Sequence, residues 1–286
     1  MTMFTKTELQ KIITTTQGAI EGMDKAEQAQ ADLRAIFDNY CSSNGGDTGG
    51  DTGGDTGGDT GGGSEPVGDL PELPSSAWRR PADFSIGWDN EMILPTWKGG
   101  AGTQFDPSQV DFRQDGSVEL EYLSKDLSGE IQVHKPKFGK GRWGWIARST
   151  KPTAVLAMFT YAQDGTEIDW EWRGDNNWQL SLHLRTADGD KVVPFAPRPT
   201  FHMTDEEIAQ WHKYEVELDE EACVWYVDDQ EVARVTLDDM PEGTVWKTDA
   251  RMDMFTSIEW HGQWAKHDYT DTPAYFEIAA LRTPAG

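Results

Sequence analysis

Short stretches in which hydrophobic and polar residues alternate recur along residues 78–286 and constrain the fold more than any other feature. Strict alternation is the period of a β-strand, whose successive side chains point to opposite faces of a sheet. Turn-like residues separate the stretches, which is typical of an all-β sandwich or barrel. The stretches read SVELEYL, EIQVH, GWIAR, TAVLAMFTY, TEIDWEW, WQLSLHLR, KYEVELD, CVWYVDDQEVARV and AYFEIAALR.

Composition divides the chain into three predicted parts. Residues 1–41 have a helical pattern, with two alternatives: a coiled-coil seam for oligomerisation or attachment, or one amphipathic helix that packs on another surface. Residues 42–77 hold a repeated GGDT motif and a Pro-rich segment, which predict a flexible linker. Residues 78–286 form the predicted folded domain. Within this domain, VWYVDDQEVARV predicts a hairpin, and TDEEIAQWH predicts a short helix capped by Thr204 with Glu207 three residues later.

Charge and cysteine content limit the classes of partner. The chain of 286 residues has 25 basic and 50 acidic residues, a formal net charge of −25. Such a chain is a poor partner for nucleic acid, anionic membranes or strongly anionic polymers, so we expect a neutral partner or substrate. Cys41 and Cys223 are the only two cysteines and lie in different predicted parts, which argues against an internal disulfide framework. Cys223 is expected to be a small buried strand residue.

The stretch GTEIDWEW, residues 165–172, places three carboxylates on one face of a predicted strand. Alternation sends Ile168, Trp170 and Trp172 into the core and leaves the acidic residues on the opposite face. Like charges in a row repel one another, and a purely structural role does not explain that cost well. The three acidic residues are Glu167, Asp169 and Glu171.

The spacing of these carboxylates suits acid–base and nucleophilic chemistry. Residues four apart on a strand have Cα atoms about 13 Å apart, so side chains that lean together bring their carboxyl groups to about 5 Å, the separation in retaining glycosidases. Crowding raises the pKa of at least one carboxyl, which can then act as a general acid while an ionised neighbour acts as the nucleophile. The alternatives are a calcium site or a solvated acidic face, as expected for KYEVELD.

Tryptophan content favours a saccharide substrate. The chain has thirteen tryptophans, all within residues 78–286. Aromatic rings stack on the apolar faces of sugar rings, and a polysaccharide cleft needs such rings. We expect Trp170, Trp172 and Trp225 in the core, and we expect the total to exceed what a sandwich core requires.

The motif GTEIDWEW resembles the Glu-Ile-Asp-x-Glu signature of glycoside hydrolase family 16, in the uninterrupted spacing of its lichenase and xyloglucan branch. Further segments resemble the family in the same order along residues 104–282. They are FDPSQVDFRQDGSVELEYL, SGEIQVHKPKFGKGRWGWIAR, AVLAMFTYAQDGTEIDWEW and WHKYEVELDEEACVWYVDDQEV. The resemblance implies a concanavalin-like β-jelly-roll sandwich of two antiparallel sheets, with the substrate in a cleft along the concave face.

The resemblance also implies roles for individual residues. Glu167 matches the nucleophile, Glu171 the acid/base and Asp169 the assisting carboxylate between them. Residues expected to bind substrate are Glu130, Phe159, Tyr161, Trp178, His183 and Trp264. Trp178 has no obvious counterpart in the family, Arg185 replaces an aromatic residue, and the register of the late strand MDMFTSIEW is unclear. The expected activity is retaining endo-β-glycanase action on a neutral β-linked polysaccharide, with β-1,3- or β-1,3-1,4-glucan favoured.

The competing hypothesis is a non-catalytic carbohydrate-binding or structural sandwich in which the acidic cluster is vestigial or binds calcium. No metal or cofactor is required by the favoured reading, and a structural calcium ion is compatible with it. No apolar run reaches the length of a membrane span, and the N-terminus lacks the pattern of a secretory signal. A chain of this kind that also has a helical segment and a flexible linker suggests an enzyme displayed on an assembly. A virion-associated location, or an extracellular one after lysis, is therefore favoured over the cytoplasm, with residues 5–41 expected to serve oligomerisation or virion attachment.

Overall fold

The computed structural model describes residues 70–99, 102–134, 139–149, 154–187, 192–194, 199–262, 265 and 272–284, with residues 192–194 described as backbone only. The predicted helical segment 1–41, with Cys41, and the linker up to residue 69 lie outside the described residues. The described residues belong to one compact unit, Glu65–Gly286.

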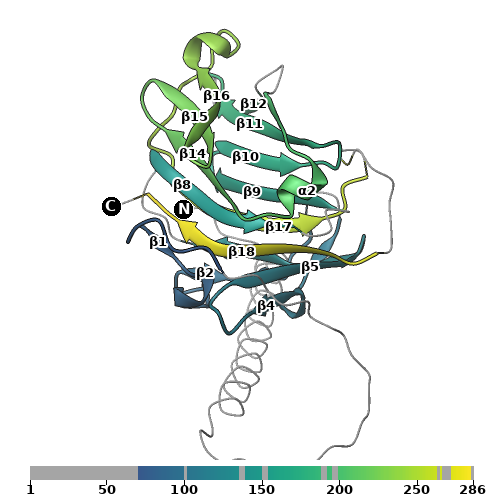
Figure 1. Ribbon diagram of the computed structural model, residues 1–286. Coiled ribbons are helices and arrows are strands. Elements are labelled where there is room, and N and C mark those ends of the chain that lie inside the picture. The colour runs from purple at the N-terminus through teal and green to yellow at the C-terminus, as the bar shows by residue number, and fades with distance from the viewer. Residues whose placement is uncertain are drawn as a thin grey trace, which may run out of the picture. The chain divides into compact units, whose positions relative to one another are not determined.

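Eighteen strands of the described residues form two sheets, which confirms the predicted all-β sandwich (Figure 1). The first sheet has ten strands in the order β16-β15-β14-β8-β18-β5-β6-β3, with β1 paired to β18 and β4 paired to β5. Nearly all neighbours run antiparallel, β3 and β6 being parallel. Its strands are β1 Trp78–Arg79, β3 Gln104–Phe105, β4 Val110–Phe112, β5 Val118–Ser124, β6 Leu127–Ser128, β8 Gly141–Arg148, β14 His212–Leu218, β15 Ala222–Val227, β16 Gln230–Thr236 and β18 Ala274–Arg282.

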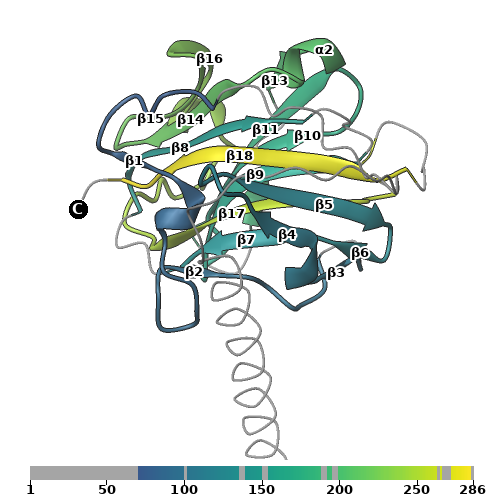
Figure 2. The same cartoon turned by 60° about the horizontal axis from the view of Figure 1, so that its bottom comes forward.

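The second sheet has eight strands in the order β12-β11-β10-β9-β17-β7-β2, with β13 paired to β11. The two sheets pack face to face, and β5 and β18 lie against β17 (Figure 2). Its strands are β2 Met92–Ile93, β7 Glu130–Val133, β9 Val155–Ala162, β10 Glu167–Trp172, β11 Asn177–Arg185, β12 Val192–Pro194, β13 Thr200–His202 and β17 Met252–Glu259.

Short helical turns connect the strands. The 3₁₀ turns are η1 Pro81–Asp83, η2 Pro107–Gln109 and η3 Leu237–Asp239, and the α-helical turn is α2 Asp205–Ile208. Thr204 caps α2 as predicted, since its hydroxyl accepts from the Glu207 N–H while the Glu207 carboxylate accepts from the Thr204 N–H. The predicted hairpin is the β15–β16 pair, whose turn residues Asp228 and Asp229 both have positive φ, as a tight two-residue hairpin turn requires.

Alternation fixes which side chains enter the core between the sheets. In β10, Ile168, Trp170 and Trp172 are buried core residues, as expected. The strands around β10 follow the same rule, so the opposite face of the eight-stranded sheet presents every other residue. We call that side, turned away from the core, the outer face.

The core takes up more tryptophan than the sequence suggested, because seven of the twelve tryptophan rings in the described residues are buried. Trp225 is among them, as predicted, and Cys223 is buried beside it. Large flat rings fill the wide space between two twisted sheets efficiently. High tryptophan content is therefore mainly a property of this core, and only part of it can serve a ligand. The buried rings belong to Trp78, Trp143, Trp145, Trp170, Trp172, Trp178 and Trp225.

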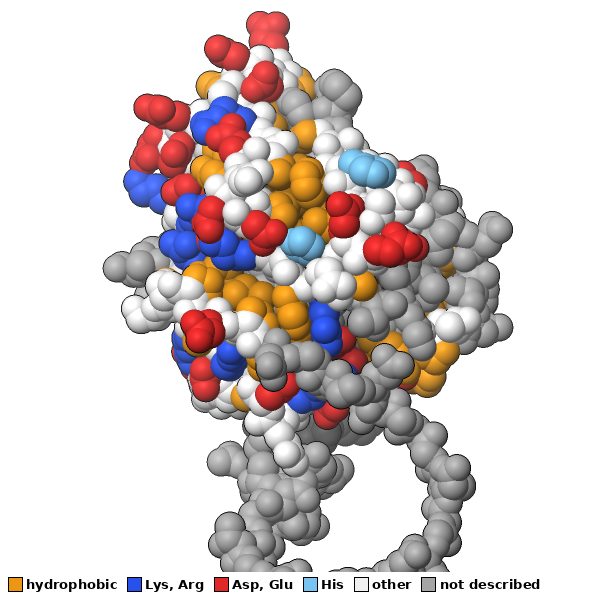
Figure 3. Space-filling model, in the orientation of Figure 1, with side chains coloured by type: hydrophobic (Ala, Val, Ile, Leu, Met, Phe, Trp, Pro, Cys, Tyr) orange, Lys and Arg blue, Asp and Glu red, His pale blue; other side chains and the backbone are white. Residues whose placement is uncertain are grey.

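The strand KYEVELD differs from the solvated acidic face that its alternation predicts. Glu215 is 1% exposed and forms ion pairs with Arg142 of the adjacent strand β8 and with Arg282 of β18, the strand beyond it. Glu277 is held in the same way by Arg113 and Arg148. Basic and acidic side chains consequently lie among one another on the surface seen in Figure 3. No helix within the described ranges has the length and hydrophobicity needed to span a membrane.

Candidate active site

The site is built on β10, an inner strand of the eight-stranded sheet. β10 pairs on one side with β9 and on the other with β11, so its register is fixed along both edges. Glu167, Asp169 and Glu171 project from its outer face, and we call these three residues the carboxylate row. Asp169, in the middle, is 4% exposed, whereas the two glutamates are partly exposed.

Cross-strand pairing places specific side chains beside each carboxylate. Glu167 lies between Tyr161 of β9 and His183 of β11, and Asp169 lies between Phe159 and Ser181. Paired residues share a face of the sheet, so all of these side chains belong to the outer face together with the carboxylate row. Glu171 lies between Ala157 and Gln179.

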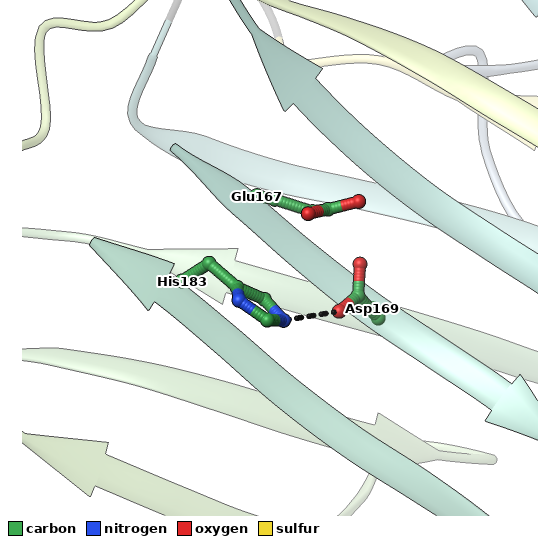
Figure 4. Close-up of side chains that lie close together, drawn as sticks. All are labelled: Glu167, Asp169 and His183. Atoms are coloured by element: carbon green, nitrogen blue, oxygen red, sulfur yellow. Dashed lines mark ion pairs between the residues drawn. The ribbon is translucent and has the colours of Figure 1, made fainter. Parts of the chain in front are cut away.

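Glu167, Asp169 and His183 form a compact group (Figure 4). The His183 Nε2 atom is 3.3 Å from the Asp169 Oδ2 atom, and one ligand atom from each residue lies within 4.8 Å of the other two. The sequence placed His183 on the substrate side of its strand. The structure adds that its ring faces the central carboxylate, which fixes the position of Asp169 next to Glu167.

The backbone of the carboxylate row is tied to the opposite sheet. The indole N–H of Trp225, in β15, donates to the main-chain carbonyl oxygen of Asp169 at 3.1 Å. A second indole, that of Trp145 in β8, donates to the Thr256 hydroxyl in β17 at 2.9 Å. Both bonds cross the core, so the position of β10 depends on packing across the whole sandwich.

Two aromatic side chains predicted to bind substrate lie on the outer face. Tyr161 is 42% exposed beside Glu167. Phe159 stacks flat on Phe255 of β17, with ring centroids 4.7 Å apart and an angle of 5° between the planes. The stack forms an apolar floor next to Asp169, which suits the apolar face of a sugar ring.

Glu130, at the start of β7, is on the outer face but is only 4% exposed. Burial, together with the nearby charge of Glu259, raises the pKa of Glu130 well above its usual range. The Trp97 side chain lies beside this carboxyl group, where its polar indole group holds the pKa of Glu130 down slightly. Burial likewise raises the pKa of Glu259 to about 7. Glu130 is predicted to contact substrate, and in the structure it lies beside Trp97 with only 4% of its surface exposed.

Trp178 is a correction to the predicted substrate-binding set. The ring is 0% exposed and packs edge-on against Trp170 and Trp172 in the core. Trp178 has the same alternation phase as Leu180, Leu182 and Leu184, all of which are buried. That phase was the available sequence signal, and it places the ring on the face opposite His183. Trp264, also predicted to bind substrate, lies outside the described residues.

Several outer-face residues were missed by the sequence reasoning. The register of β17 determines which of its residues belong to the outer face. The core takes Met252, Met254, Thr256 and Ile258, and the alternate residues face outward. Alternation within MDMFTSIEW contained this information. The missed residues of β17 are Asp253, Phe255, Ser257 and Glu259, and two more are Trp88 and Trp97, which precede β3 in the chain.

The donor atoms of the site decide which metal it could hold. Glu167, Asp169 and His183 are the group of possible metal ligands found among the described residues. Calcium takes six to eight oxygen ligands, whereas two carboxylates with an imidazole suit a transition metal better. This group therefore does not fit the calcium alternative that the sequence left open.

A row of carboxylates on an inner strand of a jelly-roll-like sandwich, flanked by aromatic rings on the same face, defines the class of glycan-cleaving sandwich enzymes. The family model described as glycosyl hydrolases family 16 matches residues 100–277. The chain belongs to this family and is a glycoside hydrolase. None of the curated proteins is similar enough in sequence to count as a match.

Solved structures with the same fold include several glucanases. The β-glucanase of Bacillus licheniformis is 15% identical, with a TM-score of 0.56 over 73% of this chain and 97% of that chain. LamAcat from Zobellia galactanivorans is 16% identical, with a TM-score of 0.58 over 73% and 96%. The catalytic domain of an endo-1,3-β-glucanase (laminarinase) from Thermotoga petrophila RKU-1 is 15% identical, with a TM-score of 0.57 over 76% and 97%. At these identities the likeness supports the shared fold.

Proposed function

We propose that this protein is a retaining endo-β-glycanase that hydrolyses a neutral β-linked polysaccharide, with β-1,3- or β-1,3-1,4-glucan as the favoured substrate. The observation that carries the proposal is the carboxylate row on one face of β10, with Tyr161 and the Phe159–Phe255 stack on the same face. Structurally similar proteins described as a laminarinase and a β-glucanase support the choice of glucan.

In the first step, the Glu167 carboxylate attacks the anomeric carbon and the glycosidic C–O bond breaks. Glu171 donates its proton to the departing oxygen, so the leaving sugar is released as a neutral alcohol. The product on the protein is a glycosyl ester of Glu167. Asp169, held by His183, keeps a negative charge close to the developing positive charge of the sugar ring.

In the second step, water attacks the same anomeric carbon. Glu171 now accepts the proton of the water, and the bond from the sugar to Glu167 breaks. Two displacements at one carbon leave its configuration unchanged, so the product keeps the β anomer. The four-residue spacing along one strand supports this course, because side chains that lean together can bring the two carboxyl groups to about 5 Å.

Reducing-end release from lichenan, laminarin, curdlan, xyloglucan and agarose tests the proposal. Wild type should release reducing ends from a glucan, and Glu167→Gln should lower kcat by at least about a thousandfold, since the ester can no longer form. Glu217→Gln is the matched control, because Glu217 also alternates with hydrophobic residues but belongs to the ten-stranded sheet. A product with the inverted anomer, or a fully active Glu167→Gln, would refute the assigned mechanism.

The alternative is a carbohydrate-binding or structural sandwich without hydrolytic activity. A wild-type protein that binds a glucan and releases no reducing ends would favour it. Addition of a chelator tests whether the site needs a bound metal ion. We expect hydrolysis and thermal stability to stay unchanged, because the proposed mechanism uses side chains alone. A loss of stability on chelation would support the hypothesis of a structural calcium ion.

We also propose that residues 5–41 display the enzyme on an assembly such as a phage particle, where it would degrade a surface glycan. The heptad-like pattern and the glycine-rich linker that follows it support this proposal. Sedimentation of the full chain and of a chain lacking residues 5–41 tests the oligomerisation part. The same number of chains per particle in both proteins would refute it.

A further inference from the structure

Four polar side chains form a hydrogen-bonded series on the outer face, at the end of the carboxylate row where Glu171 lies. Arg173 directly follows β10, and its guanidinium donates to the Gln179 Oε1 atom at 2.7 Å. The same guanidinium forms an ion pair with Asp175 at 3.0 Å. Gln179 in turn donates from Nε2 to the Ser181 hydroxyl at 3.4 Å. We call Asp175, Arg173, Gln179 and Ser181 the polar network.

The polar network lies directly beside two of the carboxylates. Strand pairing places Gln179 opposite Glu171 and Ser181 opposite Asp169. Residues directly opposite each other in an antiparallel pair share a face of the sheet, with Cβ atoms about 5 Å apart. On the other side of Glu171 the paired residue is Ala157, whose methyl group has no polar atom. Polar support from a paired residue therefore reaches Glu171 from Gln179.

Arg173 determines which way the Gln179 amide faces. A guanidinium carries donors and no acceptor, so the end of the amide that meets Arg173 has to be the carbonyl oxygen. The NH2 group then lies at the other end, toward Ser181. Gln179 is 5% exposed, and a reversed amide would set its NH2 group against the guanidinium. The amide therefore presents fixed N–H donors on the side of the carboxylate row.

Arg173 is itself held in place. Its side chain is 13% exposed, and its planar fork reaches the acceptors on Gln179 and Asp175 at the same time. The turn that carries Asp175 is closed by Asn177, whose side-chain amide donates to the Asp175 carbonyl oxygen at 2.7 Å. A lysine would keep the positive charge but not the fixed fork. Charge and geometry at this position can therefore be separated by substitution.

The charge of Arg173 counteracts the negative charge crowded around Glu171. Residues two apart on a strand share a face and have Cα atoms about 7 Å apart, close enough for an opposite charge to favour the ionised form of a carboxyl. The carboxylates among the surrounding groups have the contrary effect. The other titratable groups that these strands place on the outer face around Glu171 are Glu167, Asp169, Tyr161, His183, His202 and Glu259.

We propose that Arg173 is a positioning residue for Glu171, and that it stabilises the ionised form of Glu171 by its charge and by orienting the Gln179 amide. The inference rests on the proposed glycanase function and gives a role to the residue that follows the acidic motif. Glu171 has to give a proton in the first step and take one from water in the second. Arg173 keeps its carboxyl able to lose that proton although carboxylates surround it.

Direct titration of Glu171 tests the inference without a substrate. NMR of protein labelled with ¹³C at the side-chain carboxyl carbons follows each glutamate, and Glu171→Gln identifies the signal of Glu171. The midpoint of its titration should rise by about one pH unit in Arg173→Met, which removes both the charge and the fixed amide. Arg173→Lys, which keeps the charge, should give a smaller rise. An unchanged midpoint in a folded Arg173→Met protein would overturn the inference.

Arg234→Met is the matched control for the titration. Arg234 belongs to β16 of the ten-stranded sheet and pairs with Glu231, so its loss changes the net charge equally but leaves the outer face intact. The midpoint of Glu171 should stay at its wild-type value in this variant. A rise equal to that in Arg173→Met would mean that net charge, and not the position of Arg173, is responsible.

The pH dependence of hydrolysis gives a second measurement. The alkaline limb of kcat/KM reports the loss of the proton from the general acid, so it should move to higher pH in Arg173→Met by the same amount as the titration. Gln179→Glu keeps an acceptor for Arg173 but adds a negative charge beside Glu171, and should move the limb in the same direction. A shifted titration in a protein that hydrolyses no glucan would support the role of Arg173 and refute the glycanase function. Hydrolysis of glucan with an unshifted titration would support the glycanase function and refute the role of Arg173.

Discussion

Glu130 and Glu259 carry buried carboxyl oxygens, Oε1 and Oε2 respectively, for which the described residues offer no hydrogen-bond partner. Leaving an ionised carboxylate in such surroundings is unfavourable, which is why burial raises both pKa values. The pair lies at the margin of the outer face rather than in the carboxylate row. Its protonation therefore bears first on the stability of the fold and on the placement of Trp97.

Glu259 makes stability depend on pH. Its pKa of about 7 exceeds the ordinary value of 4.5, so between these values the folded protein holds a proton that the unfolded chain has lost. The stabilisation is complete below about pH 4.5 and disappears as pH rises through 7. Glu259→Gln should remove this dependence, which amounts to on the order of 3 kcal/mol at most. Urea unfolding at several pH values measures this dependence. If the free energy of unfolding of Glu259→Gln changed with pH as steeply as that of wild type, the assignment would be contradicted.

At the scale of the element, alternation predicted the strand faces well. For β10 it identified both the core residues and the carboxylates, because one face of that strand is fully buried and the register admits no slip. The same rule applied to β11 would have placed Trp178 with Leu180 and Leu182 in the core. The prediction that Trp178 binds substrate had no family counterpart to support it, and the local period was the better guide.

Other parts of the site could not be predicted from any local pattern. Trp97 meets Glu130, and Trp88 meets His134, across long intervals of sequence. The segment that holds both tryptophans contains the short β2 and otherwise irregular backbone, which shows no period. Such contacts are set by the folding of this segment onto β7, and this tertiary arrangement has no signature in a single sequence.

Trp178 should therefore matter for stability rather than for binding. Trp178→Ala would leave a large cavity between Trp170, Trp172 and Tyr214, and should lower the free energy of unfolding by about 3–5 kcal/mol. Trp88→Ala, which removes an equally large but exposed ring, should change it by no more than about 0.5 kcal/mol. Denaturant unfolding of both variants makes the comparison. Equal losses would contradict the assignment of the two rings to core and surface.

At the scale of the whole molecule, the described residues carry the complete carboxylate row and its supports. A chain that begins at Glu65 should keep the melting temperature and the activity on soluble glucans of the full chain, because the compact unit starts there. Differential scanning calorimetry and reducing-end assays on both chains check this. A fall in melting temperature would mean that the first 64 residues help to hold the domain together.

The acidic character of the molecule also bears on its substrate. A net charge of −25 repels polyanions at long range, although ions screen this repulsion beyond about 8 Å at physiological salt. A neutral glucan meets no such barrier. We expect turnover of glucan to change little with salt, which steady-state assays over a range of ionic strength would show.

The placement of the carboxylate row on an inner strand has a consequence for how the enzyme loses activity on heating. Its geometry is set by the repeat of one backbone, which is hydrogen-bonded on both edges and tied through Trp225 to the other sheet. Amide protons of β10 should then exchange with solvent only when the whole domain opens. On heating, activity and folded structure should therefore be lost in a single transition. An enzyme that is cooled before it aggregates should recover both together.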